Sequence, residues 1–327
     1  MAYRYVFGPV HSRRMGYSLG IDPIPRKTCS MDCIYCEVGP TDRWTMERRE
    51  WVPVEDILDE VARKLAERHR IDVITFSGSG EPVLHSGLGR IIDGIRRLTD
   101  LPIAILTNSS HLHDPAVRAD LCRTDIIVPS LDAASPEVFE RINHPHRKLR
   151  LEDIIAGLTA LRREFKGRIW LEMLFVEGLN DTDEEVRRLA EVAARVEPDR
   201  IDLNTVARPP AYEGVRGVSR ERLEAIREML GPKARIVGAA QGQPAPPTVE
   251  DLTAAILETA ARRPVTRHDL IDTLGRKPME IESVVRILLT QGRLRERVHG
   301  EDLYLDVPHE VDARIAPATR GEDTTDA

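Results

Sequence analysis

Hydrophobic and polar residues along this chain follow two periods, that of an amphipathic helix and that of a buried strand. Helical segments place apolar residues three or four positions apart, as in 53–69, where Ile57, Val61 and Leu65 fall on one face. Between such segments lie short runs that are apolar almost without interruption. Runs of that kind are typical of parallel strands buried on both faces.

The two kinds of segment alternate through the first three quarters of the chain. Strands are predicted over 72–78, 103–108, 125–132, 168–178, 200–206 and 234–238, and helices over 53–69, 89–98, 114–122, 135–143, 151–165, 183–196 and 219–230. This gives about six βα units, fewer than the eight of a closed TIM barrel. We therefore expect an α/β fold with a partial (β/α)6 parallel barrel over residues 1–240.

The composition changes after the last predicted strand. Residues 241–247 are rich in Pro and Gly and are expected to form a linker. Residues 248–307 contain three short helical segments followed by two strand-like runs, which predicts a small C-terminal winged helix domain. We expect the second helix to begin at Thr266 and to stop at Gly275. Residues 308–327 are polar and are expected to be a disordered tail.

A winged helix usually binds DNA through its third helix, but this one has few basic residues. Its third helix begins with 279–282, which is acidic, and carries a single basic residue, Arg286. Residues 248–307 contain 9 Lys or Arg against 11 Asp or Glu. Because DNA-binding domains show a basic face, we expect a protein-contact or substrate-presenting domain that does not bind duplex DNA.

Composition places the chain among globular proteins. It is 327 residues long, with 41% hydrophobic and 31% charged residues, and lacks an apolar run of 18 that could span a membrane. Its formal net charge of −7 gives no general attraction to polyanions. The opening residues lack the apolar region of a signal peptide, so we expect a cytoplasmic protein without a membrane partner.

Three of the four cysteines form a CxxxCxxC motif at Cys29, Cys33 and Cys36. A four-iron four-sulfur cluster is usually held by four thiolates, so three in one loop would leave one iron for a substrate or cosubstrate. A structural zinc site needs four Cys or His ligands, but after Cys36 the next Cys is Cys122 and the next His is His69. A disulfide framework is excluded more strongly, since 4 cysteines in 327 residues are too few.

Polar residues follow three successive predicted strands. They occupy 77–82 (Ser-Gly-Ser-Gly-Glu-Pro), 107–110 (Thr-Asn-Ser-Ser) and 130–132 (Ser-Leu-Asp). In βα folds the chemistry lies at the carboxyl ends of the strands. Each segment alone is more often a turn or a helix cap, but their occurrence behind a cysteine loop favours a binding site for a sugar and an amino acid group.

The cysteine motif, the Gly-Glu-Pro at 80–82 and these strand ends resemble the radical S-adenosylmethionine (SAM) superfamily over roughly residues 3–238. Residues 8–39 also resemble the branch that contains the archaeal wyosine synthases, which rebuild a guanine in transfer RNA. The resemblance implies one 4Fe-4S cluster, SAM, and an external reductant of the flavodoxin or ferredoxin type. It implies reductive cleavage of SAM and abstraction of a hydrogen atom from the substrate.

The resemblance also implies roles for individual residues. Cys29, Cys33 and Cys36 would ligate the cluster, and the Tyr35 backbone would lie near the adenine. The SAM amino group would be held by Ser77, Gly78, Ser79, Gly80 and Glu81. The ribose and the methionyl carboxylate would be held by Asn108, Ser130 and Asp132. The strand 171–176 would form a wall of the adenine site, and Glu172 is either a ligand or a salt-bridge partner.

The chain departs from the wyosine synthases in its cysteines. Those enzymes carry a second cysteine set for an auxiliary cluster, whereas here only Cys122 remains, which we expect to be a buried thiol. The departure argues against wyosine synthesis proper. It also argues against the peptide maturases and sulfatase activators that use auxiliary clusters.

Residues 141–150 are a candidate anion site. Six of these ten residues are Arg, Lys or His, including Arg141, Arg147 and Lys148. The other interpretation is a solvated loop, since Arg and Lys are common at surfaces. A functional loop would favour a phosphate-bearing or acidic substrate.

Three functions follow from these observations. The first is a radical SAM enzyme acting on RNA, most readily transfer RNA. The second is a protein-modifying radical SAM enzyme, such as one that activates a glycyl radical protein. The third is a non-catalytic iron-sulfur redox sensor, which would need the cysteines but not the strand-end residues.

Overall fold

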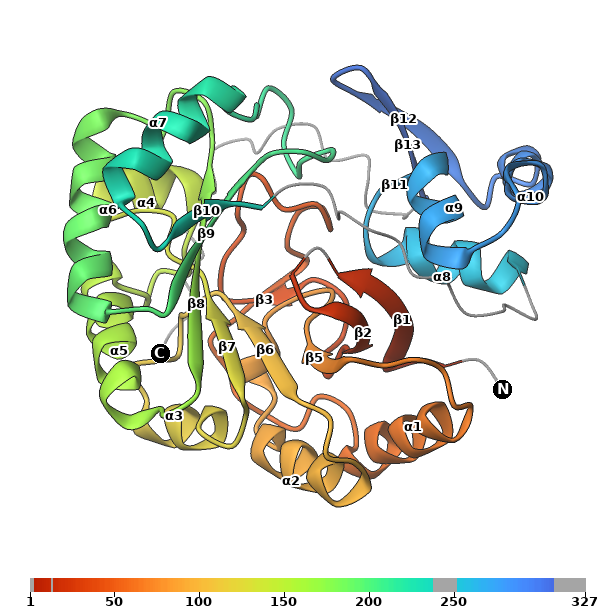
Figure 1. The fold of residues 1–327 in the computed structure, drawn as a ribbon, viewed down its shortest axis with the longest axis horizontal. Helices are drawn as coiled ribbons and strands as arrows, with labels where there is room; N and C mark the ends of the chain where they lie inside the picture. Colours follow the sequence, from red (N-terminus) through yellow and green to blue (C-terminus); the bar gives the residue numbers. More distant parts are fainter. Residues whose placement is uncertain (1–2, 13, 238–251, 309–327) are drawn as a thin grey trace, which may run out of the picture.

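The computed structural model describes residues 3–12, 14–237 and 252–308 of the chain. These residues form a large α/β unit and a smaller C-terminal unit beside it (Figure 1). The predicted linker at 241–247 lies outside the described residues, as does the predicted tail apart from Pro308.

Six parallel strands form the body of the large unit. They are β5 (Val73–Phe76), β6 (Ile103–Thr107), β7 (Ile126–Pro129), β8 (Arg168–Phe175), β9 (Arg200–Thr205) and β10 (Ala234–Ile236). Each pairs in parallel with the next in chain order, and β10 stands at an edge. This confirms the α/β class and the partial parallel barrel.

A β-hairpin that the sequence analysis did not predict extends the sheet. It consists of β1 (Val6–Ser12) and β2 (Gly16–Ile21), which are antiparallel, and β2 pairs in parallel with β5. The register shifts between Phe7 and Val10, so β1 carries a β-bulge. A Cβ at Gly20 would lie 2.0 Å from the Phe7 ring, so only glycine lets that ring cross β2.

Helices cover the outer face of the sheet (Figure 1). They are α1 (Val54–Ala66), α2 (Leu88–Leu98), α3 (Pro115–Leu121), α4 (Pro136–Asn143), α5 (Leu151–Glu164), α6 (Asp183–Val196) and α7 (Arg220–Leu230). Their apolar faces are buried, as at Ile91, Ile92 and Ile95 of α2. Among the described helices, none is long and apolar enough to cross a bilayer.

The C-terminal unit has its own small core. Its elements are α8 (Leu252–Arg262), β11 (Val265–Thr266), α9 (Arg267–Leu274), α10 (Pro278–Thr290), β12 (Arg295–His299) and β13 (Asp302–Asp306). Thr266 caps α9 through a capping box, and Gly275 ends it at φ +60°, as predicted. The three helices and the hairpin occur in the expected order. Their assignment as a winged helix domain stays a prediction.

Candidate functional site

The polar strand ends and the cysteine loop line one cavity with a volume of about 1950 Å³. The cavity lining includes every residue that the sequence assigned to the cluster or to SAM: Cys29, Cys33, Tyr35, Cys36, Ser77, Gly78, Ser79, Gly80, Glu81, Asn108, Ser130 and Asp132. Pockets for one small ligand usually enclose about 300–1,000 Å³. This cavity therefore has room for a cosubstrate and part of a second reactant.

The cysteine loop begins at the short strand β3 (Thr28–Cys29), which pairs with β4 (Arg43–Trp44). The Cys36 N–H donates to the Cys33 carbonyl at 3.1 Å, and the Gly39 N–H donates to the Cys36 carbonyl at 3.1 Å. Gly39 has φ +99°, a conformation that favours glycine. These turns keep Cys33 and Cys36 in one compact loop after Cys29.

Each sulfur of the loop accepts a hydrogen bond from a side-chain N–H group. Lys27 Nζ lies 3.3 Å from Cys36 Sγ, Asn108 Nδ2 lies 3.4 Å from Cys29 Sγ, and Asn143 Nδ2 lies 3.3 Å from Cys33 Sγ. Lys27 is 2% exposed and has φ +53°, so a charged side chain is held inside the loop by a left-handed backbone. Donors of this kind stabilise thiolates and help set the reduction potential of a cluster.

The three thiols fit an iron-sulfur cluster in their chemistry. All three are free, and burial raises the pKa of the Cys29 thiol to about 12, with the nearby Glu81 carboxylate adding to the shift. Burial also raises the pKa of the Cys33 thiol well above its ordinary value. Such thiols stay protonated until a metal ion replaces the proton on each sulfur. Iron would therefore release protons from these thiols as it binds.

The glycine-rich segment 77–82 packs directly on the start of the cysteine loop. The Ser79 carbonyl accepts from the Lys27 N–H at 2.8 Å, and the Glu81 N–H donates to the Thr28 carbonyl at 3.1 Å. A Cβ at Gly80 would lie 2.2 Å from that Thr28 oxygen, so a larger residue would push the two loops apart. The glycine is therefore needed for the close approach of the two loops.

The Glu81 side chain is buried and organises the next strand end. Its carboxylate accepts from Thr107 Oγ1 at 2.8 Å, from the Asn108 N–H at 2.6 Å and from the Val83 N–H at 3.2 Å. Burial raises its pKa to about 7, and these hydrogen bonds oppose the shift. Glu81 thus holds Asn108 in place next to Cys29, and its contact with a SAM amino group stays a prediction.

Asp132 connects three parts of the site. Its buried carboxylate accepts from the Tyr35 hydroxyl, from Asn143 Nδ2 at 2.9 Å and from the Leu174 N–H at 2.9 Å. It therefore ties the cysteine loop to α4 and to β8. Because both oxygens already accept hydrogen bonds, the geometry supports a positioning role, and direct contact with SAM stays a prediction.

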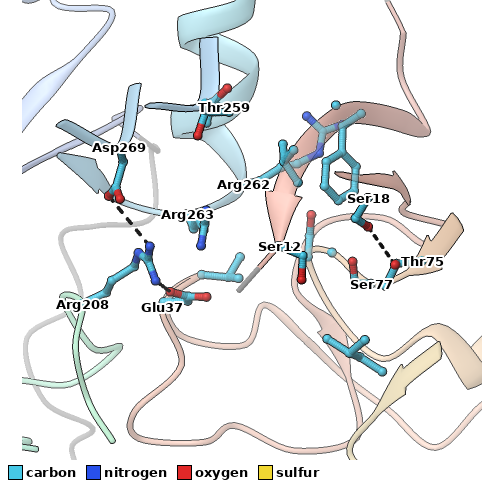
Figure 2. Close-up of a pocket in the computed structure, with 18 of the residues that line it drawn as sticks. Ser12, Ser18, Glu37, Thr75, Ser77, Arg208, Thr259, Arg262, Arg263 and Asp269 are labelled. Atoms are coloured by element: carbon cyan, nitrogen blue, oxygen red, sulfur yellow. Dashed lines mark hydrogen bonds and ion pairs between the residues drawn. The ribbon is translucent and has the colours of Figure 1, made fainter. Parts of the chain in front are cut away.

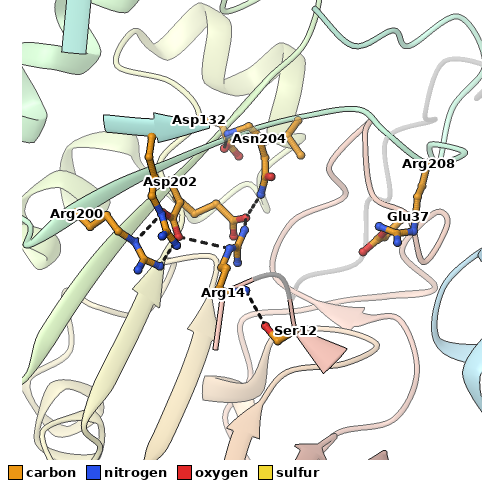
Figure 3. Close-up of polar contacts among 11 residues, drawn as sticks. Ser12, Arg14, Glu37, Asp132, Arg200, Asp202, Asn204 and Arg208 are labelled. Atoms are coloured by element: carbon orange, nitrogen blue, oxygen red, sulfur yellow. Dashed lines mark hydrogen bonds and ion pairs between the residues drawn. The ribbon is translucent and has the colours of Figure 1, made fainter. Parts of the chain in front are cut away.

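A second polar network joins β8 and β9 (Figure 3), and its members Arg14, Glu172 and Asn204 line the cavity. Glu172 pairs with Arg14 from the β1–β2 hairpin and accepts from Asn204 Nδ2. Arg14 also lies 3.4 Å from Asp202, which pairs with Arg200 at 2.7 Å. Of the two interpretations of Glu172, the structure shows the salt-bridge partner.

The basic segment 141–150 supports the cysteine loop from outside the cavity. The His146 N–H donates to the Ser30 carbonyl at 2.9 Å, and the Ile34 N–H donates to the Ile142 carbonyl at 2.9 Å. Arg141, Arg147, Lys148 and Arg150 are exposed, and none of them belongs to the described cavity lining. Any ligand they hold would lie on the surface next to the cysteine loop.

The expectation of a buried Cys122 was wrong. Cys122 is the C-cap residue of α3 and is exposed. The buried face of α3 ends at Leu121, so the next side chain projects away from the core.

Sequence reasoning missed Asn143 and the donor role of Lys27. Lys27 stands two positions before Cys29, and a basic residue that close to a cysteine motif was a usable signal. Asn143 gave no such signal, because it contacts Cys33 only through the fold, across 110 residues of sequence.

Comparison with known proteins gives a family for the chain. The sequence model described as the Radical SAM superfamily matches residues 24–190. A UPF0026 protein from Methanocaldococcus jannaschii is 37% identical over 234 residues, which cover 71% of this chain and 72% of that protein. A protein named Probable dual-specificity RNA methyltransferase RlmN, from Thermotoga maritima, is 24% identical over 217 residues, 62% of this chain and 58% of that protein.

Two further similarities concern length and fold. A protein named GTPase Obg from Brachyspira hyodysenteriae is 33% identical over 300 residues, covering 90% of this chain but 44% of that protein. The chain therefore spans less than half the length of that relative. The crystal structure of a radical SAM methyltransferase from Sphaerobacter thermophilus superposes with a TM-score of 0.51 at 17% identity, covering 67% of this chain and 65% of that one. At that identity the match shows the fold alone.

Proposed function

Because this chain belongs to the radical SAM superfamily and to the UPF0026 group within it, we propose that it is a radical SAM enzyme that acts on RNA, with transfer RNA as the first candidate. The superfamily uses a four-iron four-sulfur cluster and SAM, and in this chain Cys29, Cys33 and Cys36 are the residues that would hold the cluster. The electron would come from an external reductant of the flavodoxin or ferredoxin type.

When bound, the cluster would supply one electron for the reductive cleavage of SAM into methionine and a 5′-deoxyadenosyl radical, and that radical would take one hydrogen atom from the substrate. The chain's own residues place the reactants. Asn108, Asn143 and Lys27 donate to the three sulfurs, and Asp132 fixes the loop that carries them.

The main support for an RNA substrate is the similarity over 217 residues to a protein named as an RNA methyltransferase. One feature of the structure supports it, because the cavity of about 1950 Å³ is larger than SAM alone requires.

The test is anaerobic reconstitution of the full chain with iron and sulfide, followed by incubation with dithionite and SAM. We expect four irons per chain and formation of 5′-deoxyadenosine that increases when total transfer RNA is added. Cys33→Ala should lose both the iron and the product. Cys122→Ala is the matched control, because it removes an exposed thiol away from the cavity, and should retain both.

Two outcomes would count against the proposal. Eight irons per chain, or SAM cleavage that survives Cys33→Ala, would contradict the single three-cysteine cluster. Product formation stimulated by total cell protein but not by RNA would favour a protein substrate. Mass spectrometry of digested transfer RNA then identifies the altered nucleoside and the group added or removed.

A further inference from the structure

The C-terminal unit is attached beside the cavity, on the segment that follows β9. The Tyr304 hydroxyl donates to the Ala207 carbonyl at 2.7 Å, and Arg208 Nε donates to the Pro264 carbonyl at 3.2 Å. Residues of α8, α9 and β13 line the cavity together with the strand ends of the barrel. The C-terminal unit is thus one wall of the cavity, and any large reactant entering there passes it.

Arg208 joins the cysteine loop to this wall. Its guanidinium lies 3.4 Å from Glu37 and 3.8 Å from Asp269 (Figure 2). Glu37 directly follows Cys36, and Asp269 is the third residue of α9. Arg208 therefore engages one carboxylate of the cysteine loop and one of the C-terminal unit.

Arg263 lies beside Arg208 and has a different environment (Figure 2). It is half-buried and lines the cavity. Across residues 3–12, 14–237 and 252–308, its guanidinium makes no hydrogen bond or ion pair with another side chain. Its neighbour Arg262 contrasts with it, because Arg262 pairs with Glu258 at 3.4 Å and lies 4.2 Å from the centre of the Phe7 ring.

Arg263 lies close to a second cation, Arg208, so its surroundings favour an anionic ligand. Burial lowers the pKa of its guanidinium, and the charge of Arg208 lowers it further. The negative charges of Glu37 and Asp269 raise the pKa of the Arg263 guanidinium, but both carboxylates already contact Arg208. An arginine keeps its charge under these conditions, so the free energy of the pair falls when an anion enters between or beside the two guanidinium groups.

We infer that Arg263, with Arg208 beside it, forms a phosphate-binding subsite in the wall that the C-terminal unit contributes, and that the phosphate belongs to the RNA backbone of the substrate. The inference rests on the proposed function for the RNA. Phosphate fits because guanidinium groups bind its oxygens in a bidentate fashion. The subsite lies inside the cavity, unlike the exposed segment 141–150.

The experiment measures binding of fluorescently labelled total transfer RNA to the full chain between about 50 and 200 mM salt. We expect Arg263→Gln to weaken binding about tenfold and to reduce the slope of log K against log salt by about one, the signature of one lost phosphate contact. Arg263→Lys should lose less affinity and keep the slope. Arg286→Gln is the control, because it removes the same charge from a side chain of the same unit that is 77% exposed.

Thermal unfolding of each variant without RNA separates binding from folding. A guanidinium that binds a ligand and has no partner within the fold can be replaced without loss of folding stability. Arg263→Gln should therefore unfold at the same temperature as the parent chain or at a higher one. A marked loss of thermal stability would assign Arg263 a structural role and overturn the inference.

Three results of the binding assay would also overturn it. The first is a salt slope in Arg263→Gln that equals the slope of the parent chain. The second is a loss of RNA affinity in Arg286→Gln as large as the loss in Arg263→Gln. The third is competition by polyglutamate that weakens in Arg263→Gln as much as RNA binding does, because Arg263 would then bind any polyanion and not phosphate in particular. Failure of the proposed function looks different, since the parent chain would then show no RNA-stimulated formation of 5′-deoxyadenosine.

Discussion

Lys27 Nζ lies 3.3 Å from Cys36 Sγ, inside a loop where Lys27 is 2% exposed. A buried ammonium next to a sulfur of the cluster would stabilise the reduced, more negative form. We expect Lys27→Met to lower the reduction potential of the reconstituted cluster by about 60 mV, which is a tenfold change in the one-electron equilibrium. The measurement is a redox titration followed by electron paramagnetic resonance.

Lys27→Arg provides the control for that titration, because it keeps the charge. Its potential should stay close to that of the parent chain. If Lys27→Met retains four irons and the parent potential, then the lysine has no influence on the cluster and its contact with Cys36 is structural only.

Asp132→Ala should weaken SAM binding and leave the iron content unchanged. The expected loss of affinity is about tenfold, as for one hydrogen bond to a charged group. The variant should also unfold at a lower temperature, because Tyr35, Asn143 and the Leu174 N–H would lose their acceptor. Calorimetry with SAM and thermal unfolding measure the two effects.

Asp132→Asn distinguishes the two roles of this residue. It keeps the shape and one acceptor oxygen, so it should recover most of the stability. SAM affinity equal to that of the parent in both variants would remove Asp132 from the SAM site.

The exposed segment beside the cysteine loop gives a third prediction. If Arg147 and Lys148 contact RNA, Arg147→Glu combined with Lys148→Glu should weaken transfer RNA binding and flatten its salt dependence by about two. The matched control is Arg187→Glu on α6, where the side chain is 67% exposed. If the affinity for transfer RNA stays the same in the double variant, Arg147 and Lys148 do not contact RNA, and the cavity stays the proposed site of RNA contact.

Duplex DNA should bind the full chain at least tenfold more weakly than transfer RNA in the same buffer. The C-terminal unit offers few free cations, because Arg267 pairs with Glu282 and Glu296, each at 2.8 Å, and Arg286 also lies near Glu282. Since duplex affinity depends on neutralising phosphates, paired arginines contribute little. Tight, salt-sensitive binding to random duplex DNA in a gel-shift assay would contradict this expectation.

The repeating part of the fold was predictable because its signal is local. Strands such as β5 and β6 are almost uninterrupted apolar runs, and helices such as α6 have strict periodicity and a capping Thr182. The β1–β2 hairpin was not predictable in this way. Its residues include glycines and polar side chains, and they form strands because β2 pairs with β5 and β1 pairs with β2.

The site was predictable in its loops but not in its contacts. The cysteine motif is visible in the sequence itself. The strand ends could be assigned to one site because parallel strands bring their carboxyl ends together. The bond from Asn143 to Cys33 depends on how α4 packs on the cysteine loop, and the pairing of Arg208 with Asp269 depends on where the C-terminal unit sits. Neither arrangement leaves a local pattern.

An incomplete barrel has two edge strands, here β1 and β10, and an unpaired edge can add strands from another molecule. Both edges are poor templates. The bulge between Phe7 and Val10 interrupts the β1 ladder, and β10 is only three residues long. The barrel can therefore stay open for a large reactant without offering a long, regular edge for aggregation.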